Sequence, residues 1–219
     1  MQNATWLTQK FPRSEREFWT PCIYKYLIQC KPQLPVSVCL GPCGDYKCGR
    51  RKTFPSISLE GDVCKEPKLD VLLGKIEGAF EVNLRDDPKR FSAGNDIAGF
   101  SPDILVIRPN KQGVYLMENK PYYESELDGN QIPGGAYAEF TRWINGRVPR
   151  CEYLVIRSIS MRKSPHKKLF RLQEDLKNLF GIVLLEDVFL QMHKDDFRFP
   201  GMTESWNDYT DKSPDFLFV

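Results

Sequence analysis

The clearest pattern of hydrophobic and polar positions begins near residue 67, where apolar residues recur at helical spacing. Pro67 suits the first turn of a helix, and the apolar positions after it fall on one helix face. These positions are Leu69, Leu72, Leu73, Ile76 and Phe80. The spacing therefore predicts a helix that follows Pro67.

Two short apolar runs come next, Asp103–Arg108 and Gly113–Glu118, and their lengths suit strands. Turn-forming residues lie between the two runs, which indicates a hairpin. Farther along, the pattern predicts a helix within 133–145 stopped by Gly146, a strand over 153–156, a helix from Ser164 to Leu179 ended by Gly181, and a last strand over 181–190. This order of elements indicates an α/β fold with a central mixed β-sheet flanked by helices.

The chain before residue 67 has a less regular pattern. A helical stretch around 14–29 is interrupted at Pro21, and Ile57–Leu59 is a strand candidate. We therefore expect two regions, a helical and cysteine-rich region over residues 1–66 and the α/β core over residues 67–219.

Composition is that of a soluble globular protein. The chain has 219 residues, of which 41% are hydrophobic and 27% are charged, and this argues against wholesale disorder. No apolar run approaches the roughly 20 residues that span a bilayer. The first ten residues also lack the basic-then-apolar pattern of a secretory signal. We expect an intracellular, cytoplasmic protein without a membrane partner.

The net charge of +2 excludes a binder of nucleic acid that depends on a strongly basic tail. It hides two segments of opposite sign, however. Residues 150–178 carry eight basic and three acidic side chains, a net of +5, and residues 179–219 carry three and eight, a net of −5. The charge of each segment, taken alone, is explained if the segment forms a solvent-exposed face of the protein.

Six of the seven cysteines lie before residue 65, and the odd count favours a reducing compartment over a disulfide scaffold. Three of them share a turn-rich loop, with a fourth in reach. Four thiolates could close a structural zinc site, and buried free thiols are the alternative interpretation. The four candidate ligands are Cys39, Cys43, Cys48 and Cys64.

Acidic residues gather at one end of the expected hairpin. Asp103 opens the first strand, and the second strand ends in Glu118, Asn119 and Lys120. Because side chains alternate along a strand, Glu118 and Lys120 share one face and Asn119 takes the other. Two carboxylates at an apolar strand end are costly unless they bind a cation, and Mg²⁺ or Mn²⁺ prefers oxygen ligands. The sequence predicts a divalent-metal site with Lys120 beside it.

These residues carry a resemblance to a known family. Pro102-Asp103, followed after fourteen residues by Glu118-Asn119-Lys120, resembles the motif of the PD-(D/E)xK nuclease superfamily. The resemblance implies a restriction-endonuclease-like core that hydrolyses phosphodiester bonds of nucleic acid with Mg²⁺ or Mn²⁺. It implies that Asp103 and Glu118 hold the metal with the Asn119 carbonyl, and that Lys120 orients the attacking water.

Members of this family usually add an upstream glutamate as a metal ligand. Glu77 is our first choice, because it lies at the edge of the apolar helix face. Glu81 and Asp96 remain alternatives. For each of them, a solvated carboxylate without a role in the site is the competing interpretation.

The resemblance also indicates a nucleic-acid partner, DNA rather than RNA, for an endonuclease that could act as a homodimer. Gln131 either reaches the site or is an exposed polar residue at a helix start. Basic residues between 157 and 168 could contact phosphates, and the main candidates are Arg162, Lys163, Lys167 and Lys168.

Two other functions stay open at this point. One is a non-catalytic module on the same fold that binds nucleic acid or protein through its cysteine-rich region. The other treats the stretch from Asp103 to Lys120 as an ordinary exposed hairpin end in a protein with an unrelated function.

Overall fold

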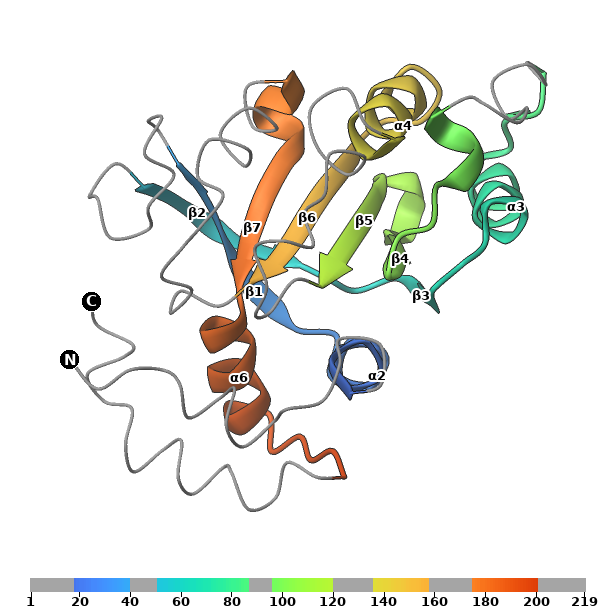
Figure 1. Cartoon of the computed structure of the whole chain (residues 1–219). Helices are drawn as coiled ribbons and strands as arrows, with labels where there is room; N and C mark the ends of the chain where they lie inside the picture. Colours follow the sequence, from blue (N-terminus) through green and yellow to red (C-terminus); the bar gives the residue numbers. More distant parts are fainter. Residues whose placement is uncertain (1–17, 40–50, 87–95, 120–135, 158–174, 201–219) are drawn as a thin grey trace.

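The computed structural model describes residues 18–39, 51–86, 96–119, 136–157 and 175–200 (Figure 1). Within these ranges, seven strands form one mixed sheet in the order β2-β1-β7-β6-β5-β4-β3. The strands are β1 (Gln33–Cys39), β2 (Arg51–Ser58), β3 (Asp62–Lys65), β4 (Ile104–Ile107), β5 (Val114–Asn119), β6 (Cys151–Arg157) and β7 (Phe180–Leu184). The α-helices are α2 (Thr20–Cys30), α3 (Leu69–Phe80), α4 (Ala136–Asn145) and α6 (Leu185–Lys194).

Parallel strands form the middle of the sheet and antiparallel strands form its flanks. β5, β6 and β7 run parallel to one another. β3, β4 and β5 are joined antiparallel on one side, and β2, β1 and β7 on the other. The end of β5 and the start of β4 therefore lie at the same edge of the sheet, together with the end of β6.

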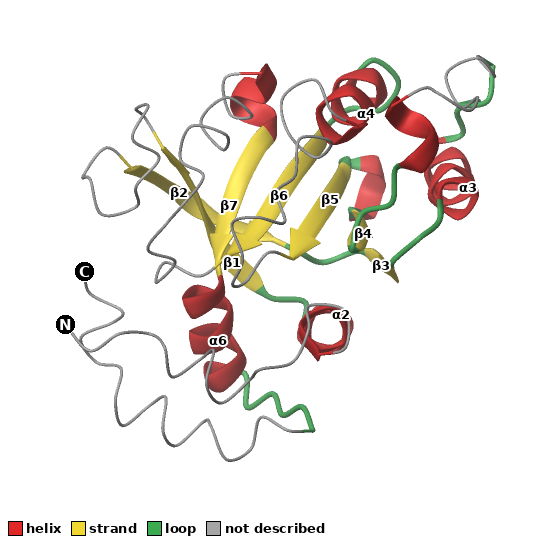
Figure 2. Cartoon of the chain, in the orientation of Figure 1, coloured by secondary structure: helices red, strands yellow, loops and turns green. Residues whose placement is uncertain are grey.

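Helices cover both faces of the sheet, as Figure 2 shows. One buried cluster joins α3 and α4 to inward residues such as Leu105, Leu116 and Tyr153. The opposite cluster joins α2 and α6 to alternate strand residues such as Val106, Met117 and Leu154. Because both faces of the sheet are buried, successive residues of a strand are apolar whichever face they point to, and the strands appear in the sequence as nearly continuous apolar runs. No helix in the described part of the chain is long and apolar enough to cross a membrane.

Most predicted elements of the core are confirmed. The apolar spacing after Pro67 corresponds to α3, the hairpin to β4 and β5, and the helix before Gly146 to α4. The α/β class and the mixed sheet with flanking helices are also as expected. Pro21 does not interrupt a helix, because it lies in the first turn of α2, where its missing N–H has no helical partner.

The predicted strand over 181–190 is wrong in its second half. β7 ends at Leu184, and Leu185 begins α6. Leu185, Val188, Phe189 and Met192 have the spacing of one helix face, and all four are buried. The continuous apolar run concealed the change from strand to helix.

Gly181 does not end a helix as predicted, because it lies within β7. A Cβ atom at this position would lie 2.3 Å from Cγ1 of Val36 in β1. The absence of a side chain therefore allows β1 and β7 to pack together. Residues 164–174 of the predicted helix before it lie outside the described ranges.

The region before residue 67 contributes three strands to the same sheet as the core. The predicted boundary between residues 66 and 67 thus falls inside one sheet. Ile57 belongs to β2, whereas β1 and β3 were not predicted. Pro35 explains part of this, since the pairing of β1 with β2 is irregular between Leu34 and Val36, where a proline cannot donate to the ladder.

Candidate active site

Two acidic residues, Asp103 and Glu118, lie at the open end of the β4–β5 hairpin. Ile104 pairs with Met117, so the next position along each strand places Asp103 opposite Glu118. Residues that oppose each other in a sheet point to the same face. Asp103 and Glu118 are 7% and 2% exposed, so two buried acidic residues lie at this end of the hairpin.

Backbone hydrogen bonds hold Asp103 from both sides. The Asn119 N–H donates to Oδ2 of Asp103 over 2.7 Å. The Glu66 N–H, just beyond β3, donates to the Asp103 carbonyl over 2.7 Å. Hydrogen bonds to a carboxylate favour its charged form. Asp103 is thereby fixed to the neighbouring strands instead of extending into solvent.

Tyr137 of α4 holds Glu118. Its hydroxyl donates to Oε2 of Glu118 over 2.6 Å and lies 3.0 Å from the Ser101 carbonyl oxygen. The ring packs against Phe100 and Tyr153, with centroids 4.7 Å and 4.9 Å away. Aromatic contacts on two sides fix the position of this hydroxyl beside the carboxylate.

The hydroxyl of Tyr137 remains protonated at neutral pH. Burial is the largest cause that holds the pKa of Tyr137 well above its ordinary value, followed by the charge of Glu118. The charge of Asp103 contributes in the same direction, as expected for a hydroxyl close to both carboxylates. Tyr137 therefore serves as a hydrogen-bond donor to Glu118.

Asn119 points to the opposite face of the sheet, as the strand alternation predicts. Its Nδ2 donates to Oγ1 of Thr20 over 2.9 Å, and both residues are fully buried. Oδ1 of Asn119 has no hydrogen-bond partner within the described residues. Glu118 and Asn119 thus connect neighbouring positions of β5 to different helices, α4 and α2.

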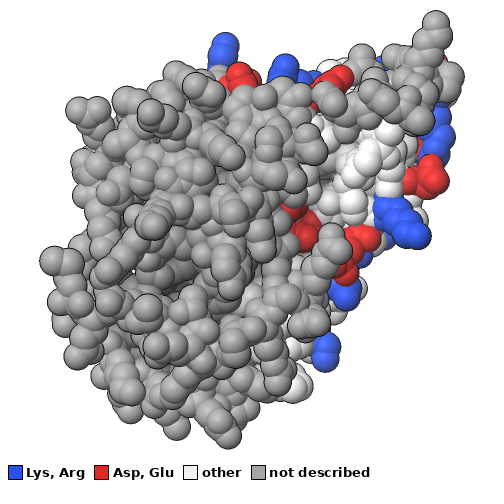
Figure 3. Space-filling model, in the orientation of Figure 1, with Lys and Arg blue, Asp and Glu red and all other residues white. Residues whose placement is uncertain are grey.

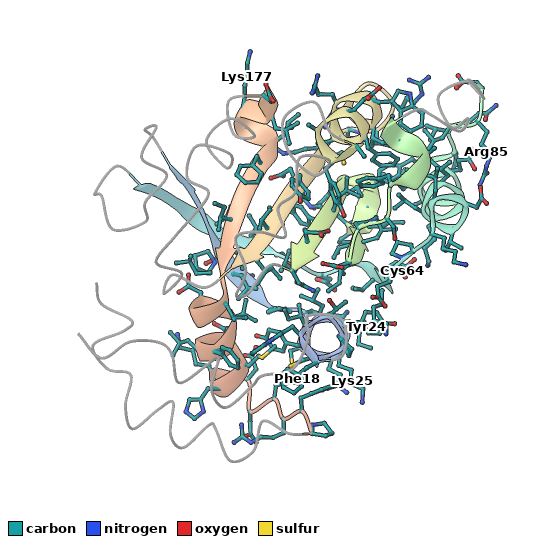
Figure 4. All side chains as sticks on the ribbon, in the orientation of Figure 1. Phe18, Tyr24, Lys25, Cys64, Arg85 and Lys177 are labelled. Atoms are coloured by element: carbon teal, nitrogen blue, oxygen red, sulfur yellow. The ribbon has the colours of Figure 1, made fainter. Side chains whose placement is uncertain are left out.

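Glu77 is not brought to the site, contrary to the prediction. Asp103 lies near the start of α3, because Ser101 and Pro67 are joined by a hydrogen bond of 3.1 Å. Glu77 lies eight residues beyond Leu69, which is about 12 Å along a helix axis. Its carboxylate accepts a hydrogen bond from the Leu84 N–H at 2.8 Å and pairs with Arg85, on the outer side of α3 in Figure 4. Glu77 closes the turn after α3.

The two alternative upstream acids, Glu81 and Asp96, lie at the end of α3 and in the segment before β4. Glu81 is 78% exposed and pairs with Lys111 at 2.8 Å. Lys111 holds the pKa of the Glu81 carboxyl below its usual range. Asp96 begins the 3-10 helix η3 (Asp96–Gly99), which precedes β4.

Several predicted site residues lie outside the described ranges. These are Lys120, Gln131, Arg162, Lys163, Lys167, Lys168, Cys43 and Cys48. Cys39 ends β1, and its side chain is likewise not described. Cys64 is a partly buried free thiol that packs against the core on the α3 side. The zinc-site prediction stays a prediction.

Asp103 and Glu118 offer the oxygen donors that a divalent cation prefers. No group of three or more histidine, cysteine or acidic residues within the described ranges has the arrangement of a metal site, so the predicted set that includes Glu77 does not form. Mg²⁺, however, is commonly held by one or two carboxylates, with waters and substrate phosphates completing its shell. Two opposed carboxylates supply that minimum.

Two contributors to this arrangement, Thr20 and Ser101, were not predicted from the sequence. Thr20 gives no local signal, since it lies 99 residues before its partner Asn119. Ser101 acts through its backbone carbonyl, which every residue has. Tyr137, by contrast, is one of the buried residues of α4.

The described surface visible in Figure 3 carries both acidic and basic side chains. Acidic and basic side chains are interspersed with uncharged surface in the view of Figure 3. Comparisons with known protein families, with curated proteins and with solved structures give no match for this chain.

Proposed function

We propose that the protein is a divalent-metal-dependent nuclease with a restriction-endonuclease-like core that hydrolyses phosphodiester bonds, with DNA as its substrate. The observation that carries the proposal is the buried pair of Asp103 and Glu118, which oppose each other at the end of the β4–β5 hairpin. The motif that contains them, with Lys120 two residues after Glu118, resembles that of the PD-(D/E)xK nucleases.

Electrostatics favours a cation between these side chains. Two carboxylates close together repel each other, and burial raises the free energy of each charge further. Tyr137 and the Asn119 N–H offset part of this with one hydrogen bond each. A divalent cation would offset the rest.

Asp103 and Glu118 would hold Mg²⁺ or Mn²⁺ and would keep their orientation through Asn119 and Tyr137. When bound, such an ion polarises a phosphoryl oxygen and lowers the pKa of a bound water. In this proposal Lys120 orients the attacking water and stabilises negative charge on the phosphate.

Chain topology supports a phosphate-binding role for the basic segment. Glu118 and Asn119 pair with Val155 and Ile156 in the parallel strand β6. β6 ends one residue later, at Arg157, so the basic segment follows in sequence from the edge of the sheet that carries the carboxylates. Arg162, Lys163, Lys167 and Lys168 are the proposed phosphate contacts, and Gln131 is a further candidate.

A cleavage assay tests the proposal. Purified protein is incubated with plasmid, single-stranded DNA and RNA, each with Mg²⁺, Mn²⁺ or EDTA. The variants are Asp103→Asn, Glu118→Gln and Lys120→Ala, and Glu81→Gln is the matched control, because Glu81 is an exposed acid paired with Lys111.

We expect metal-dependent cleavage of DNA that falls by roughly 10²- to 10³-fold in each site variant and is unchanged in the control. Cleavage that survives Asp103→Asn and Lys120→Ala would contradict the site. Binding of nucleic acid without cleavage by the wild type would favour a non-catalytic module instead.

A further inference from the structure

Asn119 joins three parts of the fold at the candidate site. Its backbone N–H bonds to Asp103, its side chain bonds to Thr20, and its own position follows Glu118 in β5. Any shift of Asn119 therefore moves a hydrogen-bond donor of Asp103 and the backbone of Glu118 together. Thr20, on the far face of the sheet, is the side chain that restrains this shift.

An asparagine side chain is energetically unfavourable at position 119. Its neighbours on the same face of β5, Tyr115 and Met117, belong to the buried cluster under α2. Asn119 is fully buried there, and its Oδ1 has no hydrogen-bond partner within the described residues. Leaving a buried polar atom unpaired opposes folding. An apolar residue would avoid that penalty, so stability alone does not explain an asparagine here.

Thr20 is a rigid partner for this amide. It is the first residue of α2 and is fully buried. The two residues before it are also buried, and Trp19 packs edge-on against Phe18 and against Phe189 of α6, with centroids 5.0 Å and 5.3 Å away. The start of α2 is thus anchored in the core, and Thr20 transmits that fixed position to Asn119.

We infer that Thr20 and Asn119 are positioning residues, and that α2 acts through their hydrogen bond to hold Asp103 and Glu118 in the arrangement that binds the divalent cation. This inference rests on the proposed function. It assigns an activity-related role to residues on the face of the sheet opposite the carboxylates. It also explains why a buried amide, whose oxygen has no partner among the described residues, occupies the end of β5.

The test compares Thr20→Val, which keeps the shape of the side chain and removes its hydroxyl, with Thr20→Ser, which restores the hydroxyl. Three quantities are measured at a temperature where all proteins are folded by circular dichroism. They are the affinity for Mn²⁺ alone, the kcat and KM of plasmid cleavage, and the hydrogen-exchange rate of the Asn119 backbone N–H relative to that of the Leu116 backbone N–H. Asn119→Leu is a second variant, which removes the side-chain amide that bonds to Thr20.

For Thr20→Val we expect Mn²⁺ affinity and kcat to fall by roughly 10- to 100-fold, the range seen when a group that orients a metal ligand is removed. KM should change little. The Asn119 amide should exchange faster while Leu116 does not, and Thr20→Ser should recover wild-type values. Asn119→Leu should lose Mn²⁺ affinity as well.

A structural role alone gives a different result. Thr20→Val would then lower the midpoint of thermal unfolding and speed exchange at both amides, with Mn²⁺ affinity unchanged, and this would overturn the inference. If the wild type cleaves and Asp103→Asn does not, but Thr20→Val matches the wild type, the inference fails while the proposed function stands. If the wild type binds no Mn²⁺, the proposed function itself fails, and the inference fails with it.

Discussion

The Tyr137 hydroxyl donates a hydrogen bond of 2.6 Å to Oε2 of Glu118, and this contact joins α4 to the end of β5. The two residues are 19 positions apart in the sequence, and each is at least nine-tenths buried. A buried carboxylate that loses such a donor is left with an uncompensated charge. The pair therefore links the stability of the fold to the state of the candidate site.

Tyr137→Phe tests that link. We expect the free energy of unfolding to fall by about 1–3 kcal/mol, because Glu118 loses a buried hydrogen-bond donor. Urea unfolding monitored by fluorescence measures the change. Tyr24→Phe is the control, since Tyr24 is only half-buried and lies on α2, and it should change stability by less than the site variant. Equal effects of the two substitutions would contradict the role given to Tyr137.

Glu77→Gln tests whether Glu77 stabilises the turn after α3, where the structure places it, or binds the metal, as the sequence predicts. Its carboxylate caps the turn after α3 through Leu84 and Arg85. We expect a loss of about 1 kcal/mol in stability, since the contact is partly exposed, and no change in Mn²⁺ affinity. Isothermal titration calorimetry with Mn²⁺ measures the affinity. A loss of affinity comparable to that of Asp103→Asn would restore Glu77 as a ligand.

Gly181→Ala should destabilise the contact between β1 and β7. The added Cβ would meet Cγ1 of Val36 at 2.3 Å, so the Val36 side chain or one of the two strands must shift. Overpacking of this kind typically costs about 1–3 kcal/mol, measured as a lower midpoint of urea unfolding. Val36→Ala in the same chain should recover part of that loss, whereas additive effects of the two substitutions would indicate that they do not meet.

Alkaline pH should destabilise the protein through Cys151. Burial is the largest cause that raises the pKa of this thiol above its ordinary value of 9.0, and the charge of Glu152 adds to it. Below that value the thiol is protonated in both states and stability is unaffected. Above it the unfolded thiol ionises while the folded one does not, so stability falls as pH rises, by up to about 1.4 kcal/mol per pH unit.

Urea unfolding of wild type and Cys151→Ala between neutral pH and pH 10 measures this effect. Because Cys22 is also buried with a raised pKa, the variant should retain part of the slope. The variant should therefore show a shallower decline than the wild type. Parallel declines in the two proteins would show that Cys151 does not contribute.

The elements nearest the candidate site could be predicted because local sequence determines them. The helical spacing after Pro67 and the two apolar runs of the hairpin each carry a strong period, and the register of the hairpin brings Asp103 opposite Glu118. The alternation that places Glu118 and Asn119 on different faces is also a local property of a strand. These predictions needed no tertiary information.

The remaining contacts depend on tertiary structure. Thr20 meets Asn119 only because α2 packs on the sheet, and the sequence gives no measure of that docking. Glu77 was chosen from the edge of an apolar helix face, but that criterion ignores position along the helix axis. Leu185 follows a strand in an unbroken apolar run, where a short window cannot separate a strand end from a helix start.

The most direct measurement is the binding of Mn²⁺ to wild type, Asp103→Asn, Glu118→Gln and the control Glu81→Gln, with free Mn²⁺ followed by electron paramagnetic resonance. We predict that wild type and control bind the ion alike. Each site variant should bind it roughly 10- to 100-fold more weakly, or not at all. Equal Mn²⁺ binding by wild type and Asp103→Asn would contradict the claim that the opposed carboxylates form the metal site.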